Sequence, residues 1–332
     1  MTVALIACSN GYGHIRRLVL LAEALKAQGA IPTIFAPLAA VKKFLNLYKV
    51  QNLNVEDFPS HTSIDDWING RGEGWIGYLP DISKYTWVVS DNLIEVLRVR
   101  KDAIISGTFF WHESLLEYNK EAAARARALL TDVAPRMISS KLFVTKQFKT
   151  EHNPYEVGLY HLNSHSSAQR TEKTDILISC GKGGSCQADV KGLVRKLAEN
   201  TIENPYNIVW VEPAALPRDS PPWMRCATYT AEMYSKILAA IIRPGVGTAT
   251  DSIVSGAKVF AFYETGNFEM TNNALALEEN NLAVNCKEIE TAWDQAKIYC
   301  KNSSAQKQMS ETSRKLNING ATESASIILT KY

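Results

Sequence analysis

The sequence predicts an α/β protein built from two Rossmann-like domains, and three observations lead to this class. Short apolar runs of strand length alternate with helix-like runs along almost all of the 332 residues. A glycine-rich turn joins a strand to a helix near the start of the chain, and a second such turn lies near residue 245. A polar, serine-rich stretch at 161–173 separates the two alternating halves. Such alternation implies mostly parallel sheets with helices on both faces.

The first half opens with the apolar run Val3–Ala7, typical of a buried parallel strand, and continues into a helix over Leu18–Lys26. Further strands are expected at 32–36, 54–58, 86–90, 103–106 and 141–144, with helices at 38–48, 93–99 and 117–130. Residues 59–82 are rich in glycine and aromatic residues and predict a long loop. This loop is either a functional lid or a surface excursion packed by its own aromatics.

The second half restarts the alternation. Its expected strands are 175–179, 207–211, 226–229, 239–242 and 259–263, and its expected helices are 187–198, 232–238, 248–255 and 271–280, followed by a helical region over 289–329. The predicted organisation is a first domain at 1–162, a linker at 163–173 and a second domain at 174–332. Ligands bind outside the carboxyl ends of strands in open α/β sheets, so two such domains facing each other would form a central cleft.

Composition excludes several classes of protein. A hydrophobic content of 46% and a charged content of 21% are ordinary for a soluble globular protein, and the net charge of +2 offers no argument for a nucleic-acid partner. The scattered cysteines, without a Cys-x-x-Cys pair, favour reduced thiols over a metal site or a disulfide framework. The N-terminus enters a strand directly and shows no signal peptide, and no apolar run approaches the roughly 20 residues that span a bilayer. We therefore expect a cytoplasmic protein.

The first glycine turn holds the most informative candidate residues. Gly11 and Gly13 allow another molecule to approach the backbone, and the following helix N-terminus favours developing negative charge. His14 lies at this helix start, where it can take or give a proton near neutral pH. Arg17 belongs to the same turn. Asp91 ends a strand at the same sheet edge and is expected either to orient His14 or to cap the helix that starts at Leu93.

The second glycine turn is a candidate anion site. Gly245 and Gly247 permit close backbone approach, and Thr248 is expected to cap the helix whose free N–H groups suit a diphosphate. Arg243 adds a positive charge. Asp251, one turn into the helix, is placed to accept a hydrogen bond from a sugar hydroxyl. A plain strand–turn–helix junction without a ligand explains the same pattern.

Two further segments of the second half hold candidate site residues. Gly181 lies in the glycine turn after the strand at 175–179. Glu269 and Asn273 are one helical turn apart, which suits recognition of sugar hydroxyls or, alternatively, an ordinary capped helix. Among the other histidines, we expect His112 to be packed beside its aromatic neighbours. The remaining ones are expected in solvated loops: His61, His152, His161 and His165.

Some enzyme classes are excluded by missing motifs. There is no Gly-x-x-x-x-Gly-Lys-Ser/Thr loop, which excludes a P-loop ATPase. Arg16 occupies the third glycine position of the dinucleotide-binding pattern, which argues against a standard dehydrogenase. There is no Gly-x-Ser-x-Gly nucleophile elbow.

Three motifs in order resemble the GT-B glycosyltransferases, with family 28 as the nearest branch. They are Gly-Tyr-Gly-His-Ile-Arg-Arg at 11–17, Arg-Pro-Gly-Val-Gly-Thr-Ala-Thr-Asp at 243–251, and Phe-Glu-Met-Thr-Asn-Asn-Ala-Leu-Ala-Leu-Glu at 268–278. The resemblance spans nearly the whole chain. It implies an N-terminal acceptor domain and a C-terminal nucleotide-sugar domain, with neither a metal nor another cofactor.

The resemblance also assigns roles to single residues. It places His14 near the reaction centre and Gly247 and Thr248 at the diphosphate. Gly11, Gly13 and Arg17 are expected to form the acceptor-side loop. Asp251 stands where the family has a glutamate that holds the ribose. Glu269 matches the acidic residue that contacts the donor sugar, whereas Met270 replaces the usual glutamine. The Glu-x7-Glu pair of many retaining enzymes is missing from the third motif, where Leu277 stands at that spacing from Glu269, and this favours inversion at the sugar.

The predicted function is therefore an inverting, UDP-sugar-dependent glycosyltransferase that acts on a hydroxyl of a cell-envelope glycan or glycolipid precursor. One alternative is a UDP-sugar hydrolase that uses water as the acceptor, because the first turn also resembles the hydrolase of pseudaminic acid synthesis. Another is a nucleotide-sugar-binding subunit of weak activity. Arg98, Arg100, Lys101 and the aromatics of 67–87 would allow peripheral contact with the inner membrane face, with a solvated charged surface as the alternative.

Overall fold

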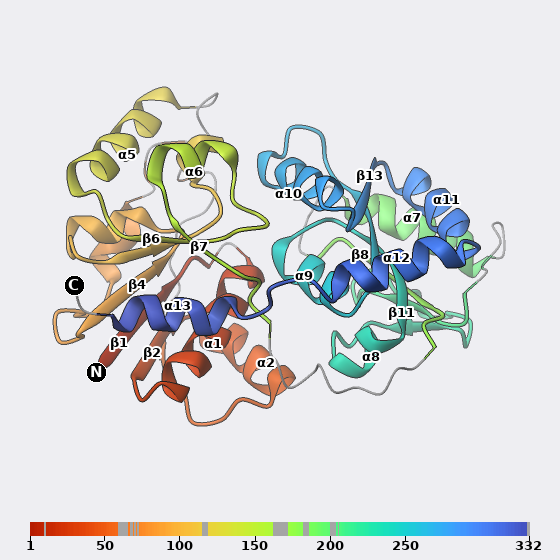
Figure 1. Ribbon diagram of the computed structural model, residues 1–332, viewed down its shortest axis with the longest axis horizontal. Helices are drawn as coiled ribbons and strands as arrows, with labels where there is room; N and C mark the ends of the chain where they lie inside the picture. Colours follow the sequence, from red (N-terminus) through yellow and green to blue (C-terminus); the bar gives the residue numbers. More distant parts are fainter. Residues whose placement is uncertain are drawn as a thin grey trace. The chain divides into compact units, whose positions relative to one another are not determined.

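The chain folds into two compact units, one formed by residues 1–162 with 317–332 and the other by residues 163–316 (Figure 1). The computed structural model describes residues 1–9, 11–58, 66, 69, 71, 73–114, 119–161, 172–181, 186–199, 204 and 206–330. The predicted linker therefore lies outside the described residues, except for its last two positions.

The first unit contains a sheet in which every pairing is parallel, with the strand order β3-β2-β1-β4-β5-β6-β7. Its strands are β1 (Thr2–Ala7), β2 (Ile31–Ala36), β3 (Asn54–Asp57), β4 (Trp87–Asp91), β5 (Ile104–Ser106), β6 (Met137–Ser140) and β7 (Tyr155–Val157). Its helices are α1 (Tyr12–Ala27), α2 (Leu38–Tyr48), α4 (Trp111–Ser114), α5 (Lys120–Val133), α6 (Lys146–His152) and α13 (Gly320–Leu329), with 3₁₀ helices η1 (Gly74–Tyr78) and η2 (Ile94–Arg98).

The continuous apolar run of β1 is explained by burial on both faces of the sheet. Val3, Leu5 and Ala7 belong to one core cluster, together with apolar residues of α1, α2 and α13. Ala4 and Ile6 point the other way into a second cluster with residues from η2, α5 and α6. Successive side chains of a strand face opposite sides, so a strand covered on both sides must be apolar throughout.

The end of the chain differs from the predicted domain boundary. We expected residues 174–332 to form the second domain, but 317–332 belong to the first unit. Helix α13 buries Ala321, Ala325 and Ile328 in the core cluster that also contains residues of α1. The hydroxyl groups of Tyr160 and Ser324 form a hydrogen bond of 2.6 Å. The apolar stripe of this last helix therefore closes one face of the first sheet.

Three predicted elements change type or position. The run 141–144 is a turn rather than a strand, with Phe143 N–H and Val144 N–H both bonded to the carbonyl of Ser140. Phe143 is fully buried, so the apolar residues that suggested a strand fill the core from a turn. The expected helix at 93–99 is the 3₁₀ helix η2, and the strand expected at 226–229 ends at Cys226.

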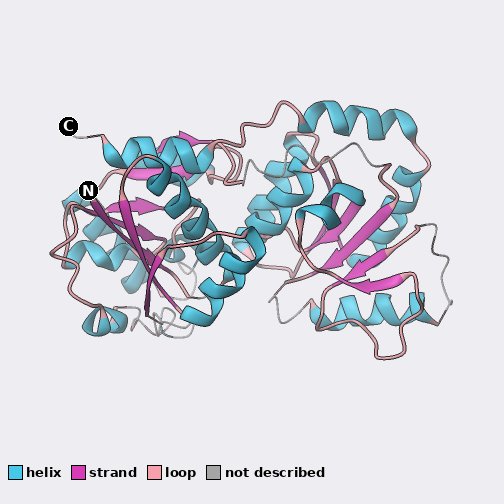
Figure 2. Cartoon of the chain, turned by 90° about the horizontal axis from the view of Figure 1, so that it is seen from below, coloured by secondary structure: helices cyan, strands magenta, loops and turns pink. Residues whose placement is uncertain are grey.

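The second unit contains a parallel sheet with the order β10-β9-β8-β11-β12-β13, seen from another side in Figure 2. Its strands are β8 (Asp175–Ser179), β9 (Val209–Val211), β10 (Met224–Cys226), β11 (Ile237–Ile242), β12 (Lys258–Phe262) and β13 (Ala283–Lys287). Its helices are α7 (Gln187–Ala198), α8 (Ala231–Lys236), α9 (Val246–Val254), α10 (Phe268–Glu279), α11 (Ile289–Cys300) and α12 (Ser303–Ser313).

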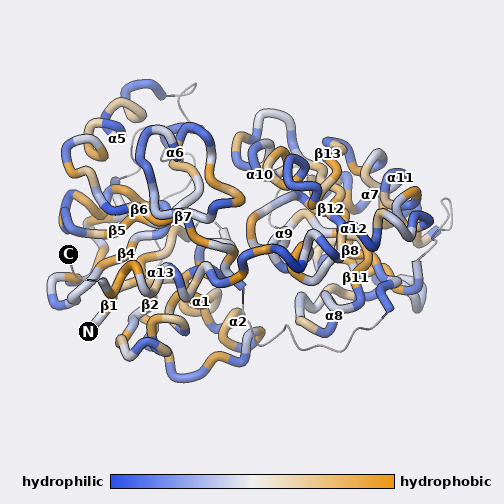
Figure 3. Tube along the Cα trace, viewed as in Figure 1, coloured by the Kyte–Doolittle hydropathy of each residue, from blue (hydrophilic) through white to orange (hydrophobic). Residues whose placement is uncertain are grey.

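Hydropathy follows this layered arrangement. The central strand β11 is apolar and buried along its whole length, whereas α12 is largely hydrophilic (Figure 3). Within the described part of the chain, none of the helices combines the length and the apolar character that crossing a bilayer requires. All six cysteines are free thiols.

The packing of α13 yields a stability prediction. Replacing Ile328 by Ala should lower the free energy of unfolding by about 2–5 kcal/mol, because it leaves a cavity beneath the helix. Thr322→Ala on the exposed face of the same helix is the control and should change it by less than about 0.5 kcal/mol. Urea unfolding followed by circular dichroism measures both, and equal effects would show that α13 is not part of the first core.

Candidate active site

The strand order of the first unit reverses direction between β1 and β4, and this point gathers the first group of candidate residues. From β1 the chain runs outward to β2 and β3, and then returns to β4 on the other side. Asp91 is the last residue of β4 and is paired with Ala7, the last residue of β1. His14 lies in the first turn of α1, directly after β1. Such a reversal is where open α/β sheets bind ligands.

His14, Asp91 and Arg17 form a close network there. Nδ1 of His14 lies 2.7 Å from Oδ1 of Asp91. Arg17 binds the same carboxylate with both ends of its guanidinium, from Nε to Oδ2 at 2.6 Å and from Nη2 to Oδ1 at 2.7 Å. The Asp91 side chain is fully buried, whereas 16% of the His14 side chain is exposed. The structure therefore brings His14 and Asp91 together and leaves part of the His14 side chain exposed.

This geometry defines which imidazole nitrogen can act as a base. Burial alone would raise the pKa of Asp91, but the Arg17 charge and the hydrogen bonds from His14 and Arg17 outweigh burial and hold that pKa below its usual value. The carboxylate is therefore ionised and can only accept hydrogen bonds, so Nδ1 of His14 carries the proton. The lone pair of Nε2 is then available to take a proton from another molecule.

The other candidate residues of this turn, Arg17, Gly11 and Gly13, differ in their surroundings. We expected Arg17 in the acceptor-side loop, whereas the structure commits its guanidinium to Asp91. Gly11 is the N-cap residue of α1, and no described side chain caps this helix. A Cβ atom placed on Gly13 would meet no other atom within 4 Å. The fold itself does not require glycine at Gly13, so the small residue leaves room beside the helix start.

The second unit repeats this arrangement between β8 and β11. The chain runs from β8 outward to β9 and β10, and then returns to β11 on the opposite side. The turn after β11 leads into α9, whose N-cap residue is Gly245, and none of the described side chains caps it. A Cβ atom on Gly245 would also meet no atom within 4 Å. Uncapped N–H groups at a helix start are a suitable anion site.

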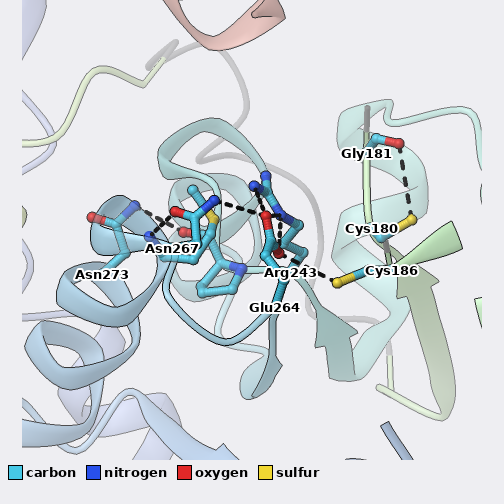
Figure 4. A network of polar contacts seen from close by, with 9 residues as sticks. Cys180, Gly181, Cys186, Arg243, Glu264, Asn267 and Asn273 are labelled. Carbon is cyan, nitrogen blue, oxygen red and sulfur yellow. Dashed lines mark hydrogen bonds and ion pairs between the residues drawn. The ribbon is translucent and has the colours of Figure 1, made fainter. Parts of the chain in front are cut away.

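Two expectations about this turn need revision. Thr248 does not cap α9, because the helix starts two residues earlier, at Val246. With Gly247 it lies in the first helical turn, and the partly buried Asp251 follows one turn later. Arg243 does not extend freely toward an anion, because Glu264 binds its guanidinium, with Nη2–Oε1 at 2.5 Å and Nε–Oε2 at 2.8 Å (Figure 4).

Gly181 follows β8 and has a left-handed backbone with φ +63, a conformation that favours glycine. Its N–H and that of Cys180 donate to Oε2 of Glu212 at 2.8 and 2.9 Å. Glu212 is buried directly after β9, and sequence reasoning missed it. An acidic residue immediately after an apolar strand is the same signal that identified Asp91. The rest of this glycine turn, residues 182–185, lies outside the described residues.

Glu269 and Asn273, which were expected to act together, both lie on α10 but differ in burial. Glu269 is partly buried in the first turn of this helix. Asn273 is only 1% exposed, and its Nδ2 donates to the carbonyl of Pro244 at 3.0 Å. Asn273 therefore holds the β11–α9 turn through a hydrogen bond to its backbone. Met270, at the position of the family's glutamine, is buried as well.

The remaining histidines give one confirmation and one correction. His112 is packed as expected, because it is buried and stacked on Phe110 with ring centres 5.5 Å apart. Burial lowers its pKa to about 3. His152 was expected in a solvated loop, but it packs against Phe110 and Phe148. The other three, His61, His161 and His165, lie in or beside segments outside the described residues.

Among the described residues, the ligand atoms of Glu113, Glu151 and His152 lie within 4.8 Å of one another, close enough to be considered for a metal ion. The charge of Arg127 acts on both Glu113 and His152 and opposes a cation there. Burial raises the pKa of Glu113 to about 7, which further weakens it as a ligand near neutral pH.

Two of the three basic residues considered for membrane contact, Arg98 and Arg100, are engaged within the protein, whereas Lys101 is exposed. Arg98 forms an ion pair with Glu73, and Arg100 pairs with Asp102 while donating to the carbonyls of Ile82 and Tyr85. The nearby aromatics were expected to be exposed. Trp75 and Tyr85 are buried, Trp87 is partly buried and Tyr78 is exposed, while Trp67 lies outside the described residues.

Comparison with known proteins gives matches in structure only. No family model matches the chain, and no curated protein matches its sequence. The glycotransferase of kitacinnamycin has 14% identity and a TM-score of 0.69, with 98% of each chain covered. Spinosyn rhamnosyltransferase SpnG has 13% identity and a TM-score of 0.67, covering 98% of this chain and 100% of its own.

A plant enzyme extends this set. UGT89C1 of Arabidopsis thaliana, solved with quercetin, has 12% identity and a TM-score of 0.63, with 98% of each chain covered. At this level of identity the likeness shows the fold alone. The predicted GT-B fold of two Rossmann-like domains is therefore confirmed, whereas a relationship to family 28 remains a prediction.

The Asp91 network predicts a pH-dependent loss of stability in Asp91→Asn. The folded state lowers the pKa of Asp91, so the ion pair stabilises fully above the unfolded value of about 3.9 and loses its effect as pH falls through the lower folded value. The variant also removes the charge that compensates the largely buried Arg17 guanidinium, which should cost about 3–5 kcal/mol near pH 7.

Unfolding free energies of wild type and Asp91→Asn, measured between pH 7 and pH 2, test this. The difference between them should be greatest above about pH 4 and should shrink below it. A difference that is constant across this range would show that the charge of Asp91 has no part in stability.

Proposed function

We propose that this chain is an inverting glycosyltransferase that moves a sugar from a nucleoside diphosphate to the hydroxyl of an acceptor. The observation that carries the proposal is the pairing of His14 with the buried Asp91, which leaves Nε2 of His14 as an available base. The confirmed GT-B fold supports it, because the solved proteins with this fold named above are glycosyltransferases.

His14 acts as the general base in the proposed reaction. Its Nε2 takes the proton from the acceptor hydroxyl as that oxygen attacks the anomeric carbon of the donor sugar. The bond between that carbon and the diphosphate oxygen breaks with its electron pair going to the diphosphate, so the configuration at the sugar inverts. Asp91 stabilises the imidazolium that forms, and Arg17 keeps the carboxylate ionised and in place.

The start of α9 stabilises the leaving diphosphate. The uncapped N–H groups after Gly245 offer hydrogen bonds, and the helix dipole favours negative charge there. Gly247 and Thr248 lie in this first turn, while Asp251 and Glu269 are proposed to contact ribose and donor-sugar hydroxyls. This site provides electrostatic stabilisation without a metal ion, so we expect turnover to persist in excess EDTA.

We propose a UDP-sugar as the donor and a cell-envelope glycan or glycolipid precursor as the acceptor. The family resemblance of the three sequence motifs supports both choices. SpnG was solved with thymidine diphosphate and with spinosyn aglycone, so TDP-sugars and small hydroxylated aglycones form the comparison arm of a substrate screen. Co-sedimentation with anionic liposomes tests whether a lipid-linked acceptor brings the protein to the inner membrane face.

His14→Ala should lower kcat by about 10²–10⁴, because the acceptor hydroxyl loses its base. Binding of the nucleoside diphosphate should remain nearly unchanged, since the proposed diphosphate site is built by α9. Initial rates and calorimetric titration with UDP measure the two effects. Turnover at the wild-type rate in this variant would remove His14 from the mechanism.

His112→Ala provides the control for a buried histidine that is assigned no role in turnover. A panel of UDP- and TDP-sugars without any acceptor separates the alternatives. Rapid, stoichiometric release of nucleoside diphosphate and free sugar would identify a hydrolase. Donor binding without turnover on every acceptor would identify a binding subunit.

A further inference from the structure

We infer that Glu264 is a positioning residue that holds the diphosphate-binding turn before α9 in its binding conformation. This inference rests on the proposed function, because it assigns Glu264 to the donor site. Glu264 lies two residues after β12 and belongs to none of the three motifs that pointed to the site. Its side chain is 23% exposed and does not need to touch the donor to act.

A single carboxylate connects three loops at one edge of the second sheet. Oε1 of Glu264 accepts from Nη2 of Arg243 at 2.5 Å, and Oε2 accepts from Nε of the same residue at 2.8 Å. Oε1 also accepts from Nδ2 of Asn267 at 2.7 Å, and Oε2 from the thiol of Cys186 at 3.3 Å. These partners come from the β11–α9, β12–α10 and β8–α7 loops (Figure 4).

The β11–α9 turn needs such external support. Pro244 restricts its backbone, but it also contains the flexible Gly245, and no described side chain caps the helix that it begins. Arg243 and Pro244, the two residues before Gly245, are both held from outside. Glu264 binds the guanidinium of Arg243, and Asn273 binds the carbonyl of Pro244. A turn held in its bound conformation loses less entropy when the ligand arrives.

The charge state of the pair suits this role. Burial tends to raise the pKa of Glu264, but the hydrogen bonds and charge of Arg243 lower it to about 2, and the pair stays ionised near neutral pH. Arg243 has only 19% of its side chain exposed, and its charge is already compensated. The donor anion is then bound mainly by the N–H groups of α9, and Arg243 acts by fixing the turn.

Glu264→Gln tests the inference by calorimetric titration with UDP and TDP and by steady-state kinetics. The substitution removes the negative charge of the carboxylate. It also replaces one of the two oxygens, both of which accept hydrogen bonds, by an NH₂ group that only donates. We expect the Kd for the nucleoside diphosphate and the donor KM to rise by about tenfold or more, the scale of one lost charge-assisted hydrogen bond. The unfolding midpoint should fall because Arg243 loses its counter-charge, but the acceptor KM should change little while circular dichroism shows the folded protein, which a general loss of structure would not produce.

Two further variants keep the test decisive if Glu264→Gln does not fold. Asn267→Ser retains a capping oxygen for α10 but deletes the amide bond to Glu264, and should weaken binding a few-fold. Arg243→Lys by itself cannot bind both carboxylate oxygens and should also weaken binding; where Glu264→Gln folds, combining the two should add little further weakening. Glu290→Gln, in the exposed pair with Lys196 of the same unit, is the matched control and should leave the Kd unchanged.

The outcomes separate this inference from the proposed function. Wild-type protein that binds neither nucleoside diphosphate would overturn both. If the wild-type protein binds a nucleoside diphosphate and the Glu264 and Asn267 variants bind it with the same Kd, only the positioning role is overturned. Tighter binding by Glu264→Gln would show that Arg243 is itself a phosphate ligand restrained by Glu264, and would also overturn it.

Discussion

In a parallel sheet all strands end at the same edge. Where the loops after two neighbouring strands run in opposite directions, a gap opens between those two loops. This constraint organises both units of the protein. It operates between β1 and β4 in the first unit and between β8 and β11 in the second. The pairing of Ala7 with Asp91 is its direct product, because it brings a carboxylate to the start of α1. The residues with a proposed chemical role lie at such an edge, at the end of a strand, on a loop or in the first two turns of a helix.

Carboxylates placed at these edges are costly to bury, and each of the three examples is satisfied by donors from neighbouring loops. Asp91 is bound by Arg17 and His14, Glu212 by the N–H groups of Cys180 and Gly181, and Glu264 by Arg243 and Asn267. An unpaired charge in these positions would destabilise the fold by several kcal/mol. The same bonds that offset this cost also hold the loops in one conformation. Stability and preorganisation of the candidate site therefore share one physical origin.

Local patterns were sufficient for the elements and turns whose residues carry their own signal. The apolar run of β1 follows from burial on two faces, and the glycine turns before α1 and α9 were found where predicted. The hydrophobic patterns predicted the wrong element where buried apolar residues lie in an irregular segment, as Phe143 does in a turn. They also missed Glu212 and Glu264. Glu212 carries the same signal as Asp91, but the bonds that both glutamates accept come from segments that only the fold brings together.

The sequence by itself determined the α/β class, the two glycine turns and the candidate base His14, because these depend on residue order and backbone freedom within a short segment. The tertiary structure alone decided that α13 completes the first core, that Arg17 binds Asp91, and that Arg243 is held by Glu264. These contacts join residues that are far apart along the chain. Which of several charged residues meets another across a sheet edge depends on strand order, and strand order is a property of the whole fold.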